Sequence, residues 1–206
     1  MKDRLLCLIA GALLSATSLW IAPAHSQEDF RCPAPGTVIE FSNGVKITAT
    51  SGDGFWCSFT DQRGRPFRRF AIFALENSSW VDKGLESLWP LKVGNQRTFE
   101  TIAAAGRVAT GIAESWLPVY YTSEFRVTGR ETVTVPAGTF ETFVVQWREF
   151  SHGPQYDGTR TWWIAPKIGY FVKSTYTQAA GLPGRAVAWE AVRISIPEAE
   201  LTPKRF

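Results

Sequence analysis

Residues that bind transition metals are scarce in this chain of 206 residues, which has only two histidines and three cysteines. His25 and Cys7 lie near the N-terminus, so the remainder of the chain carries His152, Cys32 and Cys57. These three residues do not have the spacing of zinc ligands. The sequence therefore predicts no metal centre.

Motifs for cofactor binding and for nucleophilic catalysis are also missing. The sequence contains no phosphate loop, no dinucleotide-binding glycine pattern and no Gly-x-Ser-x-Gly elbow. His152 lies near Asp157, but a Ser-His-Asp arrangement needs a wider site to place both, and a solvated loop histidine is the simpler interpretation. Glu131 interrupts an apolar strand, where an edge or barrel-mouth position explains it. We therefore expect no cofactor and no enzymatic activity.

An excess of charge of one sign is lacking too, since 22 Lys and Arg face 19 Asp and Glu. This balance argues against nucleic acid as a partner. The densest basic cluster is formed by Arg63, Arg65, Arg68 and Arg69 around Phe67. Such a cluster either contacts phosphate or anionic headgroups, or lies on a solvated hairpin whose arginines alternate with core residues. We favour the solvated hairpin.

A long apolar run occurs near the N-terminus. Lys2 and Arg4 precede the run Leu5–Ile21, and the small residues of Ala24-His25-Ser26 follow it. This order predicts that residues 1–26 are a signal peptide. A retained transmembrane anchor is the alternative, but the run is short for a span. We expect an exported protein of the bacterial periplasm with no integral membrane span after processing.

Residues 27–206 are long enough to form a single β-rich domain with a real core. Without the N-terminal segment, 20 Lys and Arg remain against 18 Asp and Glu. The two remaining cysteines, Cys32 and Cys57, favour a disulfide in an exported chain. The loop that it closes is worth about 3 kcal/mol of stability in the chain-entropy treatment. Two buried thiols are the alternative.

Most of this domain reads as short β-rich runs separated by turn residues. Asn43-Gly44 between two such runs is a strong hairpin signal. Pro136-Ala137-Gly138 predicts a three-residue loop with a left-handed glycine, which would place Val127 opposite Trp147. The fold class expected from this pattern is mainly β, a curved antiparallel sheet or half-barrel meander with one short helix.

The expected helix spans about residues 79–89. Val81, Leu85 and Leu88 recur at the spacing of one helix face, and Pro90 ends the pattern. Gly84 weakens this helical pattern. We expect the apolar face of the helix to pack on the sheet.

Three motifs occur in order along the chain: Pro90-Leu91-Lys92-Val93-Gly94, then Val133-Thr134-Val135-Pro136-Ala137-Gly138-Thr139-Phe140, then Trp162–Lys173. Their arrangement resembles small exported bacterial proteins of unassigned function with the pattern "PLxVG … VPAGTF … WYxPxxGxVK". Those proteins are similar in architecture to the lipoprotein-carrier (LolA-like) half-barrels, in which a curved antiparallel sheet wraps around helices. The resemblance covers roughly residues 88–176 and consists of turns and core positions, so it implies a fold and no activity.

Tryptophan is abundant, with eight in the predicted mature chain. These rings either fill a wide core or line a cavity in the curved sheet. Adjacent Trp162 and Trp163 must point to opposite faces of a regular strand. The alternation of the central strands predicts a ligand-binding face with these candidate residues: Val127, Val133, Phe143, Val145, Trp147 and one of Trp162 and Trp163.

Two functional hypotheses follow from these observations. The first is a non-enzymatic envelope protein that binds an apolar or amphipathic small molecule or lipid inside a half-barrel. The alternative is an interaction module that docks on an envelope protein or glycan through a sheet edge or an aromatic patch. A continuous apolar void above about 300 Å³ would favour the first hypothesis, and a filled interior with an exposed aromatic patch the second. The sequence identifies neither the ligand nor a protein partner.

Overall fold

The computed structural model describes residues 30–76, 84–109, 114–152, 156–180 and 187–197, with backbone alone for 102–109, 114–119 and Ala180. The predicted signal peptide lies outside the described residues. The described chain forms eleven strands and one 3-10 turn, η2. Their bounds are β1 (Val38–Phe41), β2 (Lys46–Asp53), β3 (Trp56–Asp61), β4 (Pro66–Phe70), β5 (Ala74–Leu75), η2 (Leu85–Leu88), β6 (Gln96–Ala109), β7 (Glu114–Val135), β8 (Gly138–Ser151), β9 (Asp157–Ala165), β10 (Tyr170–Ala180) and β11 (Trp189–Ser195).

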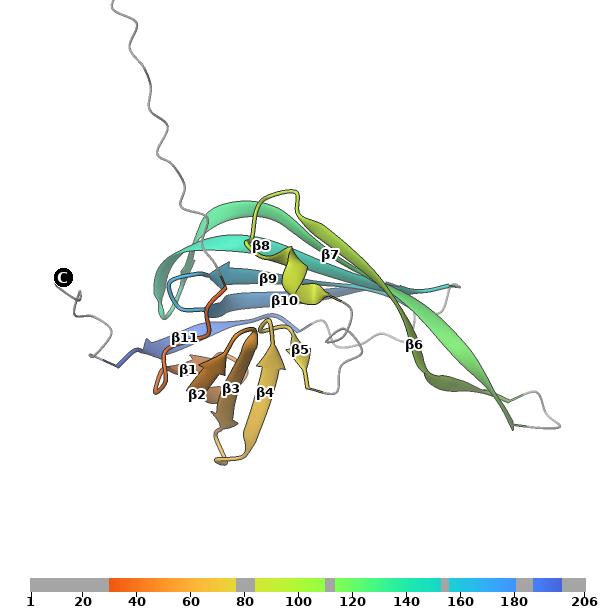
Figure 1. Cartoon of the computed structure of the whole chain (residues 1–206), viewed down its shortest axis with the longest axis horizontal. Helices are drawn as coiled ribbons and strands as arrows, with labels where there is room; N and C mark the ends of the chain where they lie inside the picture. Colours follow the sequence, from red (N-terminus) through yellow and green to blue (C-terminus); the bar gives the residue numbers. More distant parts are fainter. Residues whose placement is uncertain (1–29, 77–83, 110–113, 153–155, 181–186, 198–206) are drawn as a thin grey trace, which may run out of the picture.

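All eleven strands belong to one antiparallel sheet in the order β5-β4-β3-β2-β1-β11-β10-β9-β8-β7-β6. The sheet curves back on itself, so that β1–β5 form a lower layer beneath β7–β10, and β6 with β7 projects as a two-stranded arm (Figure 1). The expected fold class, a mainly β curved antiparallel sheet, is therefore confirmed. Alternation along the strands gives each layer a buried face, as in β3, where Cys57 and Phe59 are buried and Ser58 and Thr60 are less buried.

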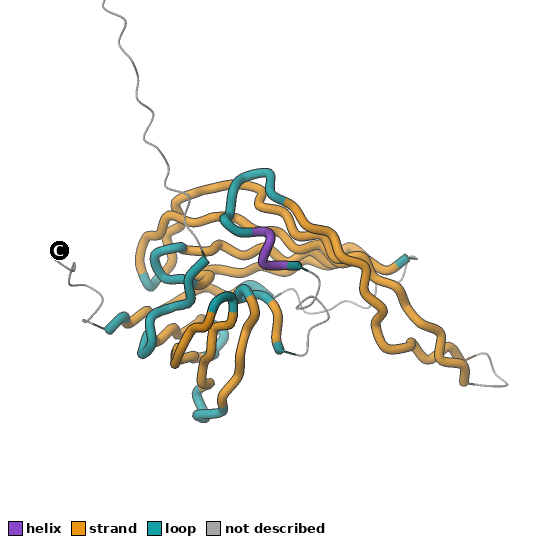
Figure 2. The backbone as a smooth tube through the Cα atoms, viewed as in Figure 1, coloured by secondary structure: helices purple, strands orange, loops and turns teal. Residues whose placement is uncertain are grey.

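The helix expected near residues 79–89 is only partly described. Residues 79–83 lie outside the described residues, and η2 is the helical turn that follows (Figure 2). Gly84 precedes the turn with a φ of 79°, a left-handed conformation that separates η2 from the preceding residues. Leu85 and Leu88 are fully buried, as their apolar spacing predicted. No helix among the residues described here has the length and apolarity needed to cross a bilayer.

The central hairpin differs in register from the expectation. Val135 pairs with Gly138, so the turn contains the two residues Pro136 and Ala137 and not three. From the turn to Gly129, the shorter loop moves each partner by one residue from the expected register. A bulge between Val127 and Gly129, which a sequence pattern does not show, shifts the pairing by one further residue. As a result, Val127 lies opposite Val145 and Trp147 lies opposite Phe125.

The two layers meet in an aromatic core around Phe73. This residue follows Ala71 and Ile72, which take left-handed φ values of 48° and 60° in the turn between β4 and β5. The turn directs the Phe73 ring against Trp162 of β9 and Phe125 of β7, with ring centroids 4.7 and 5.6 Å apart. Burial of these rings joins strands that no hydrogen bond of the sheet connects.

The cysteines form the expected disulfide. Cys32, in the segment before β1, is bonded to Cys57 of β3, and their Cα atoms are 5.4 Å apart. Cys57 is fully buried, and a side chain at Gly52 would collide with Cys32. The bond therefore fixes the entry of the chain against the lower layer.

Replacement of Phe73 by alanine should lower the free energy of unfolding by about 3–5 kcal/mol, because a buried ring between both layers is lost. Urea denaturation measures this change. Val93→Ala, at a position that is 60% exposed, is the control and should stay within about 0.5 kcal/mol of the wild type. Equal effects of both substitutions would contradict the role of Phe73.

Removal of the disulfide by the double substitution Cys32→Ser and Cys57→Ser should cost about 3 kcal/mol, because the unfolded chain gains the freedom of the opened loop. Thermal unfolding with and without reductant checks this. The wild type should lose stability on reduction and the double variant should not. Alkylation of both cysteines in the unreduced folded protein would refute the bond.

Gly138→Val should destabilise the protein by about 1–3 kcal/mol, because φ at this position is 136° and a β-branched residue resists positive φ. Thr139→Val, at the exposed neighbouring strand position, is the matched control and should change little. The two melting temperatures are compared directly. A Gly138→Val melting temperature equal to that of the control would mean that the turn relaxes to a negative φ.

Candidate functional site

The predicted ligand-binding face is mostly occupied by its own side chains. Val127 and Val145 are fully buried, and Trp162 is 5% exposed. The rings of Trp147 and Trp162 are nearly parallel, with centroids 5.9 Å apart and planes 8° apart, and the Phe125 ring lies parallel to both, 5.9 Å from Trp147 and 6.4 Å from Trp162. This part of the concave face is a layer of parallel rings.

The remaining predicted residues are spread over other parts of the sheet. Val133 and Phe143 lie beyond the bulge and are buried, Phe143 beside a residual void of only about 20 Å³. Trp163 lies on the opposite face, where its indole N–H donates to Glu131 and the ammonium group of Lys173 sits 4.8 Å from its ring. The structure thus brings Val127, Val145, Trp147 and Trp162 together and separates Trp163 from them.

A ligand-sized pocket of about 380 Å³ opens elsewhere, between the β1–β4 hairpins and strands β10 and β11. Aromatic and aliphatic side chains form most of its wall, and polar side chains of the β1–β2 and β3–β4 turns stand at its mouth. Its lining comprises Phe41, Asn43, Val45, Ile47, Asp61, Gln62, Arg65, Phe67, Arg69, Tyr170, Phe171 and Trp189.

Strand alternation explains the apolar lining. Ile47 of β2 and Phe67 of β4 project from the lower layer, and Tyr170 of β10 projects from the other side. The Tyr170 ring lies 4.4 Å from Phe171 and 6.4 Å from Phe41, which forms a continuous aromatic surface. Burial raises the pKa of Tyr170, so its hydroxyl is neutral near pH 7.

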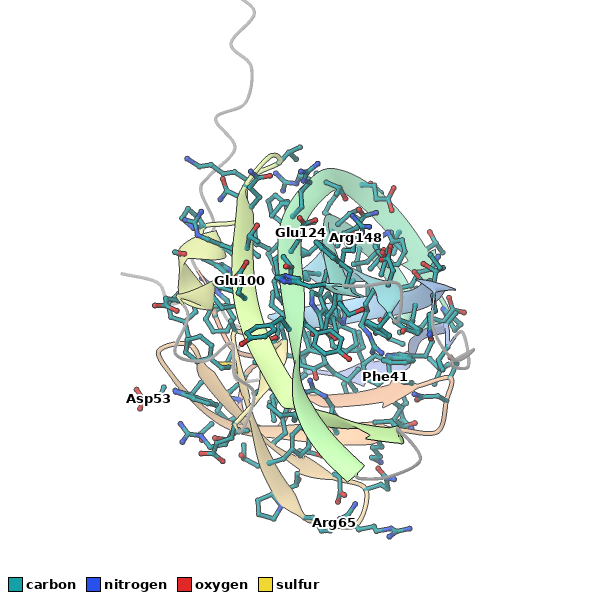
Figure 3. All side chains as sticks on the ribbon, turned by 90° about the vertical axis from the view of Figure 1, so that its right-hand side faces the viewer. Phe41, Asp53, Arg65, Glu100, Glu124 and Arg148 are labelled. Carbon is teal, nitrogen blue, oxygen red and sulfur yellow. A yellow bond between two sulfur atoms is a disulfide. The ribbon has the colours of Figure 1, made fainter. Side chains whose placement is uncertain are left out.

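The mouth of the pocket carries an ion pair. Arg65 donates through Nε to Asp61 Oδ2 at 2.7 Å, and Asp61 also accepts from the backbone N–H groups of Arg63 and Arg65. The side-chain bond from Arg65 is the largest cause that lowers the pKa of Asp61. Figure 3 shows Arg65 at the outer tip of this turn and Phe41 in the lower layer. The carboxylate nearest the mouth is therefore already paired.

Two further arginines lie deeper than this pair. Arg69 lies two residues after Phe67 on the same face of β4, lines the pocket and donates through Nη1 to the Phe73 carbonyl at 3.3 Å. The guanidinium of Arg160 in β9 lies over the rings of Tyr176 and Trp189, 5.4 and 5.2 Å from their centroids. Burial lowers the pKa of Arg160, and the charge of Arg69 adds to this effect.

A group of polar side chains continues along the concave face from Arg160. The hydroxyls of Tyr156 and Tyr176 are 2.8 Å apart, and Gly158 leaves the space that this contact needs. Ser123 donates to Glu149 Oε1 at 3.1 Å. Burial raises the pKa of Glu149, and burial with the Tyr176 hydrogen bond raises that of Tyr156. One end of the interior is therefore polar.

The outer face of the sheet has a polar groove of about 400 Å³ across β6–β9. Arg148 binds both carboxylate oxygens of Asp157 and faces Glu124 across β7 and β8 (Figure 3). Asp157 is thus paired to Arg148, whereas His152 Nε2 lies 2.9 Å from the Thr122 hydroxyl. The described contacts do not join His152 to Asp157. No group of three potential metal-binding side chains occurs in the described ranges.

The sequence pattern does not predict this pocket, although it contains a signal for one of the lining residues. Arg68 and Arg69 belong to one basic cluster in the sequence, but alternation puts them on opposite faces of β4. Arg68 stacks over Trp56 at 4.6 Å outside the pocket, whereas Arg69 shares the inner face of Phe67. The phase of Arg69 relative to Phe67 would have indicated its inward position.

Comparison with known families gives a match over part of the chain. A family described as DUF3108-like matches residues 119–186, about a third of the sequence. This region contains the turn motif at residues 133–140 and the motif Trp162–Lys173, whereas the Pro90–Gly94 motif lies outside it. The resemblance is supported for those two motifs. No curated protein sequence matches the chain.

The solved structures that are similar to this chain include three bacterial proteins. The hypothetical lipoprotein YmcC of Escherichia coli is 15% identical over 81% of this chain and 88% of its own, with a TM-score of 0.45. A Bacteroides fragilis protein assigned as exported, with a YmcC-like fold, is 14% identical over 82% and 99%, with a TM-score of 0.38. A protein of Parabacteroides distasonis assigned as a lipoprotein is 14% identical over 81% and 99%, with a TM-score of 0.36.

Glu149→Gln should change how stability depends on pH. Because burial raises the pKa of Glu149 above its ordinary value of 4.5, the stability contributed by its neutral form is complete below pH 4.5 and is lost as the pH rises through the folded pKa. The variant avoids this loss, so its advantage over the wild type should grow from pH 4 to pH 8. Urea denaturation across this range measures the difference.

Glu141→Gln, at an exposed position of the same strand, is the control for the neutral amide. Its difference from the wild type should not grow with pH in the same way. A constant difference for Glu149→Gln over the whole range would mean that Glu149 ionises as easily in the folded as in the unfolded chain.

Proposed function

We propose that this protein is a non-enzymatic exported protein of the bacterial envelope that binds an apolar or amphipathic small molecule in the pocket between β1–β4 and β10–β11. The observation that carries the proposal is the pocket itself, about 380 Å³ in volume and floored by aromatic rings. Its volume lies at the lower end of the range for small-molecule sites, and it combines an aromatic and aliphatic wall with polar side chains that can orient a ligand.

Export is supported by the predicted signal peptide and by the Cys32–Cys57 disulfide. Such a bond persists in an oxidising compartment such as the bacterial periplasm. The ligand would enter past the turns at the mouth, where Val45 is 39% exposed, and would lie against Tyr170 and Trp189. Apolar surface buried there would supply most of the binding free energy.

Closure of the pocket mouth by Val45→Trp tests the proposal. Val192→Trp is the matched control, because Val192 is also 39% exposed but lies on β11 outside the pocket lining. Binding of a fluorescent fatty-acid probe is titrated for each variant. The first substitution should weaken binding about tenfold or more, and the second should leave it unchanged.

Trp147→Ala distinguishes ligand binding in this pocket from ligand binding on the face predicted by sequence alone. Its ring stacks with Phe125 and Trp162 and does not line the pocket. If Trp147→Ala weakens uptake of the probe whereas Val45→Trp does not, the ligand binds on the predicted face. If the wild type takes up no probe, the proposed function is wrong.

A second function, docking on an envelope protein or glycan, is favoured by the edge strand β6. This strand pairs with β7 on one side and stands at the end of the strand order. An unpaired strand edge can accept an extended peptide through main-chain hydrogen bonds. The polar groove on the outer face, which includes Gln96 and Thr98 of β6, adjoins this edge.

A further inference from the structure

We propose that the ligand of the pocket is an amphipathic anion, whose carboxylate or phosphate group is held by Arg69 and Arg160 while its alkyl chain lies on the aromatic wall. The inference rests on the proposed function and adds the chemical class of the ligand. It starts from two guanidinium groups on the inner surface of the half-barrel.

Both arginines reach the same region from opposite layers. Arg69 lines the pocket from β4. Arg160 shares the concave face of β9 with Trp162, and its guanidinium lies 5.2 Å from the ring of Trp189, which also lines the pocket. Trp189 therefore borders both the pocket and Arg160, and the charge of Arg69 acts on Arg160.

Neither guanidinium has a carboxylate partner among the described side chains. The Nε atoms of Arg69 and Arg160 are both buried, and neither has a hydrogen-bond partner. The nearby carboxylates have other partners, since Asp61 is bound by Arg65 and Glu149 accepts a hydrogen bond from Ser123. The inner surface therefore carries two positive charges that ring contacts and, for Arg69, the Phe73 carbonyl offset only in part.

A third polar group, Ser174, lies on the same face of the sheet as Arg160. Ser174 of β10 pairs with Trp189 across the sheet, so the two side chains project from the same face. Ser174 is completely buried, and its Oγ has no hydrogen-bond partner. A buried hydroxyl without a partner is unfavourable, and an anion near Trp189 would accept its hydrogen bond.

A carboxylate or phosphate matches these three groups. Guanidinium groups bind both anions through paired N–H bonds, which are stronger when the site excludes water. The wall formed by Phe41, Phe67 and Tyr170 would hold the apolar part of the same molecule. A small inorganic anion would bind the two guanidinium groups but would leave this aromatic wall exposed to water.

Isothermal titration calorimetry of the wild-type protein with decanoate, decyl phosphate, decanol and inorganic phosphate tests the inference. Decanoate or decyl phosphate should bind at least about tenfold more tightly than decanol. Comparison of decanoate with decyl phosphate shows whether the site prefers a carboxylate or a phosphate. This preference should decrease at high salt. Inorganic phosphate should bind far more weakly than either amphiphile.

Arg69→Met and Arg160→Met should each remove most of the preference for the anion while leaving decanol binding within about twofold. Arg63→Met, at the exposed turn position, is the control and should retain the preference. If either interior variant fails to fold, the comparison of decanoate with decanol in the wild type still shows whether the pocket prefers an anion.

The outcomes distinguish the two proposals. Equal affinity for decanol and both anions would overturn the assignment of Arg69 and Arg160 and leave the pocket as a site for neutral apolar molecules. Inorganic phosphate that binds as tightly as decyl phosphate would show an anion site without a role for the aromatic wall. Binding of none of the four compounds would overturn the proposed function together with this inference.

Discussion

The insertion of Phe73 between the two layers is the contact on which closure of the molecule depends. Hydrogen bonds in an antiparallel sheet run only between neighbouring strands, so they give no reason for β4 to approach β9. Burial of the Phe73 ring against Trp162 and Phe125 supplies that reason. The turn that aims it uses left-handed Ala71 and Ile72, a conformation that costs roughly 1–2 kcal/mol per residue outside glycine. The aromatic contact offsets this cost and holds the sheet as a half-barrel.

Local patterns were sufficient to predict the fold class. Alternation and turn residues indicated antiparallel strands, and the buried positions of Val127 and Val145 follow from that alternation. The register of the central hairpin was not predictable in the same way. Pro136-Ala137-Gly138 is compatible with loops of two or three residues, and the bulge near Gly129 depends on how the whole sheet bends.

The pocket was harder to predict because its walls come from opposite ends of the chain. Phe41 and Phe67 precede Trp189 by more than a hundred residues, and the pairing of β1 with β11 together with the packing of the two layers brings them together. The tryptophan count correctly drew attention to aromatic surface, but it could not separate rings that fill the interior from rings that face a cavity. Arg69 shows the same limit, since its inward direction becomes meaningful only when a second layer faces it.

The central position of the β1–β11 pair has a consequence for how the chain assembles. Strands β1–β5 form one local meander and β6–β10 another, each held by contacts between consecutive segments. The seam between the two meanders is the pairing of the first strand, β1, with the last strand, β11. Loop closure over this distance must precede any gain from the pairing, so the seam has the highest contact order in the sheet. During synthesis on a ribosome, both meanders would be complete before β11, the strand that unites them, emerges. Until then their aromatic surfaces would be exposed to solvent.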